Sequence, residues 1–384
     1  MSRRTLQCKG PPAARVLTAV LALALAGGSP ELGTAGPRIG ACPVFPANNV
    51  WNTPVAGLPV DPNSDAYVAA IGASDPVHGD FGAGLYNGAP IGIPYVVVRA
   101  DQQNVDIVFA GFADEPEPYA DESDPGPAPI PAHAPIEGGA ASQDDRHVIV
   151  VQDQSCTLFE LYRAVPNGDG SWNAVVMARH DLTSNAMRPQ GWTSADAAGL
   201  PIFPGLVRYD EMATGTITHA LRFTAPKTRN AFVWPARHAA SRHNDPDLPP
   251  TGQRFRLKAS VDISGFSPTN QVILRALQTY GMILADNGSP WFISGAPDPR
   301  WDDDDVQGQL RQLAGADFEA VDVSGLIKMR TLPQPANSRA ALFRTAPRRC
   351  SGAQTPIVRR RRRAARGGPF GCDNPVRGSR SAIF

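Results

Sequence analysis

Short segments of β-branched and aromatic residues, separated by glycine, asparagine and aspartate, dominate the middle of this 384-residue chain. The NGDG stretch between Tyr162 and Trp172 is typical of a tight turn between antiparallel strands. Further strands are predicted at 254–263, 291–295 and 318–324. We therefore predict a mainly β fold, an antiparallel β-sandwich or jelly-roll-like single domain. The segments before residue 183 are IPYVVVRA at 93–100, VDIVFAGF at 105–112, RHVIVVQD at 146–153, TLFELYRA at 157–164 and WNAVVMARHDL at 172–182.

Two or three short helices accompany the predicted strands. Ser267 can cap a helix in which apolar residues recur at helical spacing until Gly281. A second helix is predicted to begin in the acidic run 302–305, because negative charge stabilises a helix N-terminus. Calcium binding is the alternative for that run, but the run lacks the alternating ligands of a known cation loop. Thr193 and Asp196 have capping-box spacing, so we expect a structural role for Asp196.

Three regions are predicted along the chain. Residues 1–41 are a signal peptide and N-terminal linker, because basic residues precede the apolar run 16–26, which is too short to span a bilayer. Export by the general route and export by the twin-arginine route are both open. Residues 42–329 form a single β-rich domain, and residues 330–384 are a disordered arginine-rich tail or a spurious, out-of-frame extension. We expect a secreted, extracellular protein with no membrane span.

The charge of the predicted domain is strongly negative. Residues 330–384 contain 13 arginines and one acid, and residues 1–41 contain five bases and one acid. The region between them therefore carries 18 bases and 34 acids, a net charge of −16. Such a field opposes binding of polyanions, so we expect no nucleic acid partner.

Cysteines and known motifs narrow the chemistry. Cys42 and Cys156 are the two cysteines of the predicted domain, and export to an oxidising compartment predicts a disulfide between them. The chain has no CxxC or Cys/His spacing typical of a metal site. It also lacks GxSxG, HExxH, P-loop and GxGxxG motifs, so we predict no metal and no cofactor.

The segment GTITHALRFTAPKTRNAFVWPARHAAS, residues 215–241, is interpreted as a β-hairpin with its turn at Lys227 and Thr228. Alternation then places His219 and His238 on one face, at the end opposite the turn. Arg222 and Arg237 lie on the other face. Structural histidines bonded to backbone are the alternative for each ring. A one-residue shift in register would change these partners.

Acidic residues near that end complete a predicted site. Asp210 and Glu211 precede the first strand of the hairpin, and the polar loop 113–140 is expected to border the same groove. We predict catalytic roles for Asp210, Glu211, His219, His238 and Glu137, and substrate contacts for Arg222, Arg237, Trp234 and His147.

Several long stretches are distinctive enough to mark a family: FPANNVWNTPV, DRHVIVVQDQSCTLFELYRA, GWTSADAAGLPIFPGLVRYDE, HALRFT, FVWPARHAAS and YGMILADNGSPWFISGAPDPRWDDDD. In these the chain resembles a family of secreted bacterial β-rich proteins over about 280 residues. The resemblance implies no reaction, and no catalytic residue is carried over from it.

The function that these features favour is cleavage of glycosidic bonds in an extracellular polysaccharide by general acid/base catalysis, either as a glycoside hydrolase or as a polysaccharide lyase. A non-catalytic glycan-binding or cell-surface module is the first alternative. A metal-dependent hydrolase using His219, His238 and a carboxylate is the second. We expect a polysaccharide or glycan partner and a monomeric protein.

Overall fold

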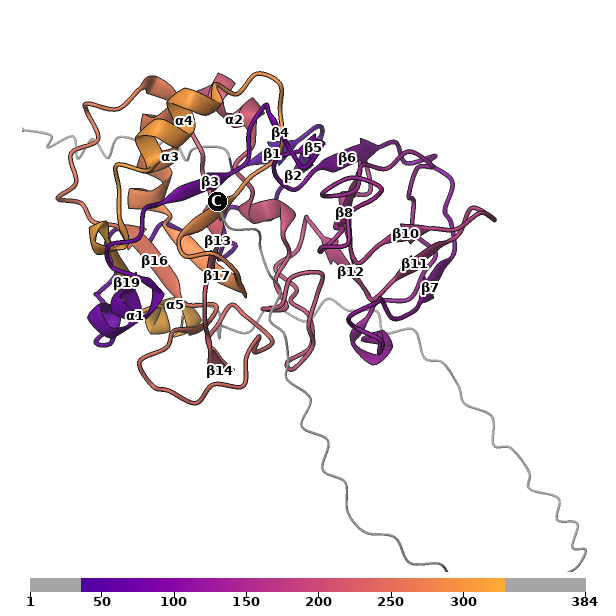
Figure 1. Ribbon diagram of the computed structural model, residues 1–384, viewed down its shortest axis with the longest axis horizontal. Helices are drawn as coiled ribbons and strands as arrows, with labels where there is room; N and C mark the ends of the chain where they lie inside the picture. Colours follow the sequence, from indigo (N-terminus) through magenta and orange to yellow (C-terminus); the bar gives the residue numbers. More distant parts are fainter. Residues whose placement is uncertain (1–35, 329–384) are drawn as a thin grey trace, which may run out of the picture. The chain divides into compact units, whose positions relative to one another are not determined.

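The computed structural model describes residues 36–328 (Figure 1). Strands account for 27% and helices for 16%, so the prediction of a mainly β fold is confirmed. The predictions for residues 1–35 and 329–384 lie outside the described residues.

The largest sheet has six strands and mixes parallel with antiparallel pairs. β13 lies parallel to β17, and β18 lies parallel to β3, so the prediction of purely antiparallel pairing is wrong. Long connections, rather than tight turns, join these parallel neighbours. The order is β19 (Phe318–Val321), β16 (Arg254–Leu257), β17 (Met282–Asn287), β13 (Leu221–Ala225), β18 (Phe292–Ser294) and β3 (His78–Asp80).

Helices cover one face of the six-stranded sheet. Residues of α1 (Ser64–Ile71), α3 (Pro268–Thr279) and α4 (Asp303–Leu310) share one buried apolar cluster with residues of β13, β16 and β17 (Figure 1). Both predicted helices are confirmed: Ser267 accepts a hydrogen bond from the Asn270 amide, and Asp302 accepts one from the Asp305 amide.

The described residues contain more helices than predicted, because several are too short to show helical periodicity. The α-helices beyond those three are α2 (Tyr209–Thr214) and α5 (Ser324–Lys328), and the 3₁₀ helices are η1 (Ala120–Glu122), η2 (Phe203–Gly205) and η3 (Gly315–Asp317).

A four-stranded sheet packs near the opposite face of the six-stranded sheet. Ile149, Val151 and Leu158 from this second sheet share a buried cluster with Ile283 and Ala285 of β17. The segment from residue 195 to 206 supplies much of the cluster between them. The order of the second sheet is β12 (Val176–Asp181), β9 (Thr157–Tyr162), β8 (Val148–Gln152) and β6 (Tyr95–Val98).

The other face of the four-stranded sheet packs on a three-stranded sheet of β10 (Val165–Pro166), β11 (Trp172–Ala174) and β7 (Ile107–Phe109). Ala128 and Ile130 enter the cluster between these sheets and are fully buried. The middle part of the predicted polar loop 113–140 therefore packs into the core instead of lying on the surface. A sandwich or jelly roll stays a prediction.

The predicted hairpin at 215–241 is wrong. β13 lies between β17 and β18, and its successor β14 (Arg229–Phe232) pairs instead with β15 (Pro250–Thr251). Thr228 is fully buried and its hydroxyl donates to the Asn287 side chain, so the chain leaves β13 toward the end of β17 rather than reversing in a tight turn. The remaining strands form two short pairs, β1 (Arg38–Ile39) with β2 (Cys42–Pro43) and β4 (Leu85–Tyr86) with β5 (Ala89–Pro90).

Cys42 and Cys156 form a disulfide with their Cα atoms 5.3 Å apart, which confirms the predicted bond. The bond joins the start of the described chain to the turn between β8 and β9. A buried disulfide is typical of proteins in an oxidising compartment. Within residues 36–328, none of the helices has the length and apolar character that crossing a membrane requires.

Candidate functional site

The structure separates the residues predicted to share one site. His219 and Glu211 are in contact, but Asp210 turns away and pairs with the exposed Arg300 at 2.7 Å. His238 Nδ1 faces the Ala197 carbonyl at 2.9 Å instead of an acid. The remaining predicted binding residues are engaged in packing: Arg237 donates to the Arg188 carbonyl, and Trp234 packs against two apolar clusters.

His219 and Glu211 form a closed ion pair. The His219 ring is fully buried, with Nε2 3.0 Å from Glu211 Oε1 and Nδ1 donating to the Ala220 carbonyl at 2.8 Å. Arg208 binds the same carboxylate at 2.6 Å. Burial acts to raise the pKa of Glu211, but Arg208 and His219 hold it below its usual value. Because Arg208 and His219 both contact the carboxylate of Glu211, this pair has the features of a structural element.

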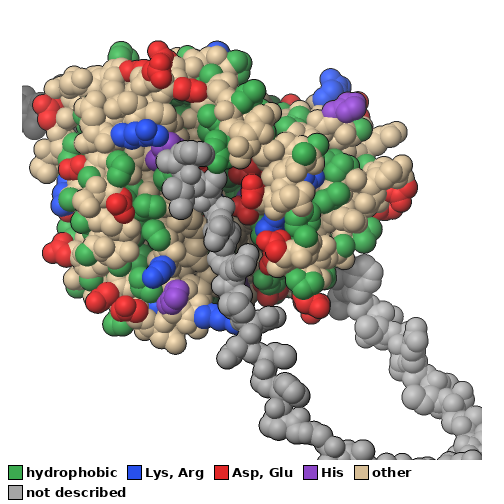
Figure 2. Space-filling model, viewed as in Figure 1, with side chains coloured by type: hydrophobic (Ala, Val, Ile, Leu, Met, Phe, Trp, Pro, Cys, Tyr) green, Lys and Arg blue, Asp and Glu red, His purple; other side chains and the backbone are tan. Residues whose placement is uncertain are grey.

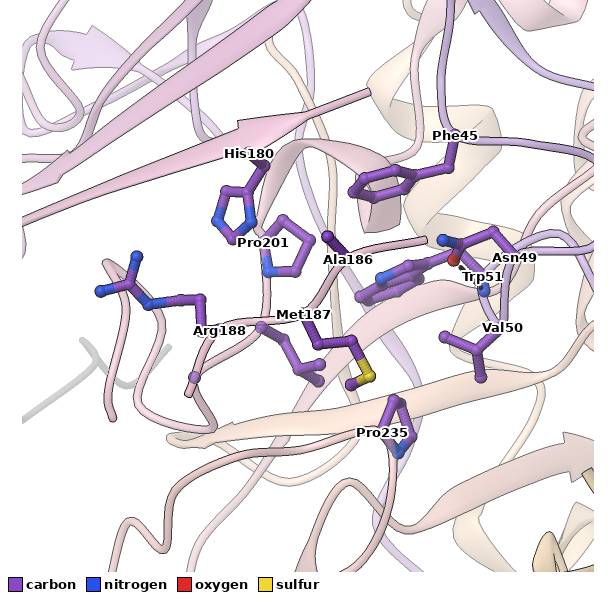
Figure 3. Close-up of a pocket in the computed structure, with 12 residues that line it drawn as sticks. Phe45, Asn49, Val50, Trp51, His180, Ala186, Met187, Arg188, Pro201 and Pro235 are labelled. Carbon is purple, nitrogen blue, oxygen red and sulfur yellow. Dashed lines mark hydrogen bonds between the residues drawn. The ribbon is translucent and has the colours of Figure 1, made fainter. Parts of the chain in front are cut away.

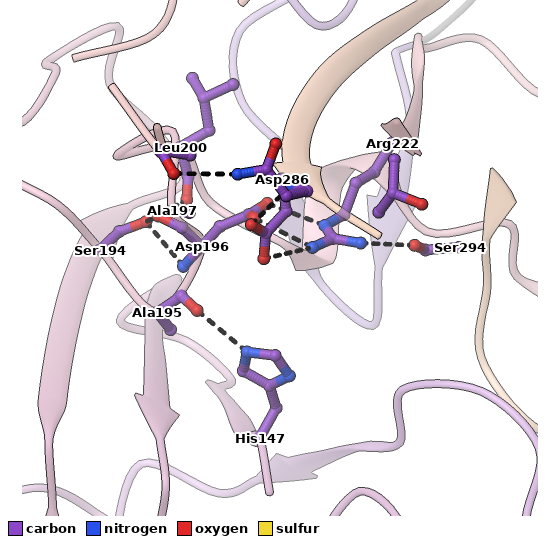
Figure 4. A network of polar contacts seen from close by, with 12 residues as sticks. His147, Ser194, Ala195, Asp196, Ala197, Leu200, Arg222, Asp286 and Ser294 are labelled. Atoms are coloured by element: carbon purple, nitrogen blue, oxygen red, sulfur yellow. Dashed lines mark hydrogen bonds and ion pairs between the residues drawn. The ribbon is translucent and has the colours of Figure 1, made fainter. Parts of the chain in front are cut away.

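A second group of charged residues gathers around Arg222 on β13 (Figure 4). Arg222 forms two hydrogen bonds with Asp196, at 2.8 and 2.9 Å, and donates to Ser294 Oγ at 2.7 Å. Asp196 is fully buried. Residues 193–199 form no helix, so the predicted capping box is wrong, and Asp196 instead anchors this loop to the six-stranded sheet.

Sheet register brings two further acids to the face of Arg222. Asp80 at the end of β3 is the register partner of Ser294, which lies beside Arg222. The register shifts between Phe223 and Thr224, and this bulge makes Asp286 the partner of Thr224, on the same face as Arg222. Asp286 Oδ2 lies 3.7 Å from Arg222 Nη2.

The pKa values of these two acids are raised. Burial, aided by the negative charge of Glu137, raises the pKa of Asp80 to about 6. Burial and the charge of Asp196 raise the pKa of Asp286 to about 7, against the opposing effect of Arg222. Near neutral pH a substantial fraction of Asp286 therefore carries a proton.

The third part of this group comes from the residues before β8. His147 is buried, with Nδ1 2.5 Å from Glu137 Oε2 and Nε2 2.9 Å from the Ala195 carbonyl. Burial alone would lower the pKa of His147, but Glu137 raises it to about 9. Burial acts to raise the pKa of Glu137, and the charge and hydrogen bonds of His147 hold it below its usual value.

Asp145 lies beside this pair. Ligand atoms of Glu137, Asp145 and His147 all lie within 4.8 Å of one another. Burial and the charge of Glu137 raise the pKa of Asp145, although His147 opposes them. We call Asp80, Glu137, Asp145 and Asp286 the acid cluster, because each of the four lies close enough to another acid or to Arg222 for its pKa to respond.

The acid cluster is accessible from solvent. The side chains of Glu137 and Asp286 are each 24% exposed, whereas Asp196 behind them is fully buried. In the view of Figure 2, acidic side chains are scattered over the described surface, with fewer basic side chains between them. The carboxyl groups of Glu137 and Asp286 are therefore partly open to solvent, whereas Arg222 and Asp196 are buried.

A separate pocket lies beside the segment from Gly199 to Pro201 (Figure 3). His180 borders it, and the Nε2 atom of this buried ring has no hydrogen-bond partner among the described residues. Burial and the charge of Arg188 lower the pKa of His180 to about 3, so the ring is neutral. The other polar side chains at this pocket are engaged: the Arg188 guanidinium donates to Thr193, Asp124 and Glu122.

Sequence reasoning found part of the acid cluster and missed the rest. Glu137 and His147 were predicted site residues, and Arg222 was predicted as a substrate-binding residue. Asp80 and Asp286 were missed because each lies at the end of a strand whose neighbours come from distant parts of the chain. A carboxylate that follows an apolar strand, as in MILADN at 282–287, is the available signal.

Comparisons of the chain with protein-family models, with curated proteins and with solved structures give no match. The resemblance to a family of secreted β-rich proteins therefore stays a prediction, and the functional argument depends on the geometry described above.

Proposed function

We propose that this protein is a secreted enzyme that hydrolyses glycosidic bonds of an extracellular polysaccharide by general acid/base catalysis at the acid cluster. One observation carries the proposal: two carboxyl groups of one accessible cluster have pKa values displaced in opposite directions, Glu137 downward and Asp286 upward to about 7. Environments that separate the pKa values of two acids are typical of acid/base pairs in glycoside cleavage.

Asp286 is the proton donor in the proposed reaction. Its carboxyl group retains a proton near neutral pH and is partly exposed, so it can protonate the oxygen of the leaving sugar. Ionised Glu137 accepts a proton from the attacking water, whose hydroxyl bonds to the sugar carbon as the glycosidic bond breaks. The proton lost by Asp286 and the proton gained by Glu137 balance, and exchange with solvent restores both groups.

Neighbouring residues position this pair. His147 holds one oxygen of Glu137, and the Ala195 carbonyl holds the far side of the His147 ring. Arg222 is fixed by Asp196 and Ser294, so its charge cannot follow a substrate and acts only on the acids beside it. The disulfide and the negative charge of the predicted domain support an extracellular, sugar-binding role rather than a polyanion-binding one.

The proposal is tested by incubating the purified full-length chain with a panel of neutral, acidic and amino-sugar polysaccharides and measuring new reducing ends. We expect cleavage of at least one polymer, and a loss of about 100-fold or more in Glu137→Gln and Asp286→Asn. Asp210→Asn, at an exposed acid outside the cluster, is the matched control and should retain full activity.

Two outcomes would contradict the proposal. Binding to a polymer without any new reducing ends would favour a non-catalytic glycan-binding module. Cleavage that is unchanged in both cluster variants would place the reaction elsewhere. Unsaturated sugar ends among the products would change the reaction from hydrolysis to elimination by a lyase.

A further inference from the structure

Three donor atoms, one imidazole nitrogen and two carboxylate oxygens, converge where β8 of the four-stranded sheet begins. His147 Nδ1 and one carboxylate oxygen each from Glu137 and Asp145 lie within 4.8 Å of one another. The Glu137 and Asp145 side chains are partly exposed, while the His147 ring is buried. The donors therefore form a small group that is open on the side of the carboxylates.

The backbone fixes the positions of all three donors. The Glu137 amide donates to the His147 carbonyl at 3.0 Å, which joins the two stretches directly. The Arg163 amide donates to the Asp145 carbonyl at 2.8 Å, which ties Asp145 to the end of β9. The group is thus held by main-chain contacts that do not involve the donor atoms.

The orientation of the His147 ring is set from outside the group. Nε2 donates to the Ala195 carbonyl at 2.9 Å, and this contact directs Nδ1 toward the two carboxylates. Histidines that bind metals in proteins commonly donate their second ring nitrogen to a carbonyl or a carboxylate in this way. The Ala195 contact therefore supplies the outer support that a metal-binding histidine needs.

Acidic side chains outnumber basic ones around the donors: Glu137, Asp145, Asp80 and Asp286 lie near His147 and Arg222. Asp80 and Asp286 belong to the same acid cluster, and the nearby Arg222 already forms two hydrogen bonds with Asp196. A divalent cation bound by the three donors would offset two of these negative charges, whereas Asp196 and Arg222 neutralise each other.

From this geometry we propose that Glu137, Asp145 and His147 bind one divalent cation of the first transition series, of the Zn²⁺ or Mn²⁺ type. An imidazole nitrogen with two carboxylate oxygens suits such ions, whereas Ca²⁺ and Mg²⁺ prefer oxygen ligands alone. The cation takes the place of the proton between His147 Nδ1 and Glu137, and this proton leaves to solvent on binding. One oxygen from Glu137 suffices for the cation, and its second oxygen can accept a proton. The cation would polarise the water that attacks in the proposed reaction, but its binding does not require that the reaction occurs.

The experiment measures cation binding without any substrate. The full-length chain, purified without a histidine tag and stripped with a chelator, is dialysed against Zn²⁺, Mn²⁺, Ca²⁺ or Mg²⁺, and bound metal is counted by elemental analysis. We expect one Zn²⁺ or Mn²⁺ per chain and a higher Tm with the metal than without it. Binding should weaken at least tenfold in Asp145→Asn and in His147→Gln.

His219→Gln is the matched control, because His219 also pairs with a glutamate and a backbone carbonyl, but no second carboxylate of the described residues joins it in a metal-binding group. It should bind the metal as the unmodified chain does, and circular dichroism checks that each variant folds. Absence of stoichiometric metal, or equal weakening in His219→Gln, would overturn the proposal. If the chain binds no metal yet cleaves a polysaccharide, the metal proposal fails and the proposed reaction stands. If it binds metal but cleaves nothing, the metal proposal stands and the proposed reaction fails.

Discussion

His147 and His219 are two buried histidines with nearly the same immediate partners. Each ring places one nitrogen against a glutamate, at 2.5 Å for Glu137 and 3.0 Å for Glu211, and the other against a backbone carbonyl. The surroundings of the two glutamates differ. Arg208 binds Glu211 directly, whereas Arg222, whose charge acts on Glu137, is bound to Asp196, and further acids lie near the pair.

This difference separates a structural pair from a candidate reactive one. Glu211 is bound by Arg208 and His219 and has a side chain that is only 12% exposed, so little of its charge is left to act on another molecule. Glu137 is 24% exposed and lies among acids whose pKa values are raised. The same side-chain pair thus supports different roles according to the charges around it.

The largest expected effect comes from removing Arg222, the arginine that is bound to Asp196 rather than to Glu137. Arg222→Met should lower the free energy of unfolding by about 3–5 kcal/mol, because the fully buried Asp196 loses the one ionic partner it has among residues 36–328. Arg208→Met should cost less, about 2 kcal/mol, because Glu211 keeps His219 and some contact with solvent. Urea unfolding at neutral pH measures both values.

Arg300→Met provides the control for that comparison. Arg300 pairs with Asp210 and Asp298 at the surface and is 49% exposed, so its loss should cost less than about 1 kcal/mol. If Arg208→Met destabilises the protein as much as Arg222→Met, the distinction between the two regions fails.

Exchange of each glutamate should separate activity from stability. Glu137→Gln should lower kcat/KM on a cleaved polysaccharide by about 100-fold, which corresponds to about 2.7 kcal/mol. Glu211→Gln should leave kcat/KM within about threefold and should instead lower the free energy of unfolding by about 1–3 kcal/mol, because Arg208 and His219 lose an ionised partner.

The two measurements are made on the same preparations, so that inactive but folded protein is distinguished from unfolded protein. A loss of activity in Glu211→Gln as large as that in Glu137→Gln would show that the two pairs belong to one functional unit.

Local patterns in the sequence were sufficient for elements whose partners are close in the chain. The helices capped by Ser267 and Asp302 are present, because capping and helical periodicity act over a few residues. The disulfide between Cys42 and Cys156 was predictable from compartment and count alone. Glu137 was recognisable as an acid on the polar loop 113–140, and His147 as a polar residue at the start of an apolar strand.

Long-range pairing could not be predicted in the same way. Two adjacent β-rich segments around residue 227 have a hairpin pattern, but β13 contains apolar residues that pack under the helices and Arg222 that faces Asp196. The backbone of such a buried strand needs hydrogen-bond partners along both of its edges, and β17 and β18 supply them. The bulge that places Asp286 beside Arg222 depends on that pairing, so the acid cluster became visible only in the folded chain.

A third buried pair gives the smallest effect and the finest test of the comparison. Glu160 is fully buried, lies 3.9 Å from His180 Nε2 and accepts hydrogen bonds from the Ile202 and Phe203 amides. Here the histidine is neutral and no arginine in the described part of the chain contacts the acid, so burial raises the pKa of Glu160 to about 7. Stability from this group is therefore fully present below its unfolded pKa of about 4.5 and is lost as the pH rises through about 7.

Glu160→Gln should remove that loss, because glutamine keeps a carbonyl oxygen for the two amides and cannot ionise. At pH 5 the variant should be less stable by about 1 kcal/mol, because its amide replaces a protonated carboxyl group and is costly to bury. At pH 8 the variant should be more stable by about 1–2 kcal/mol, less than the roughly 3 kcal/mol of the full shift, because the glutamine amide is itself costly to bury. Urea unfolding at the two pH values measures the difference. A gain that is equal at both pH values would mean that Glu160 stays ionised in the folded protein and that burial without a charged partner does not set its protonation.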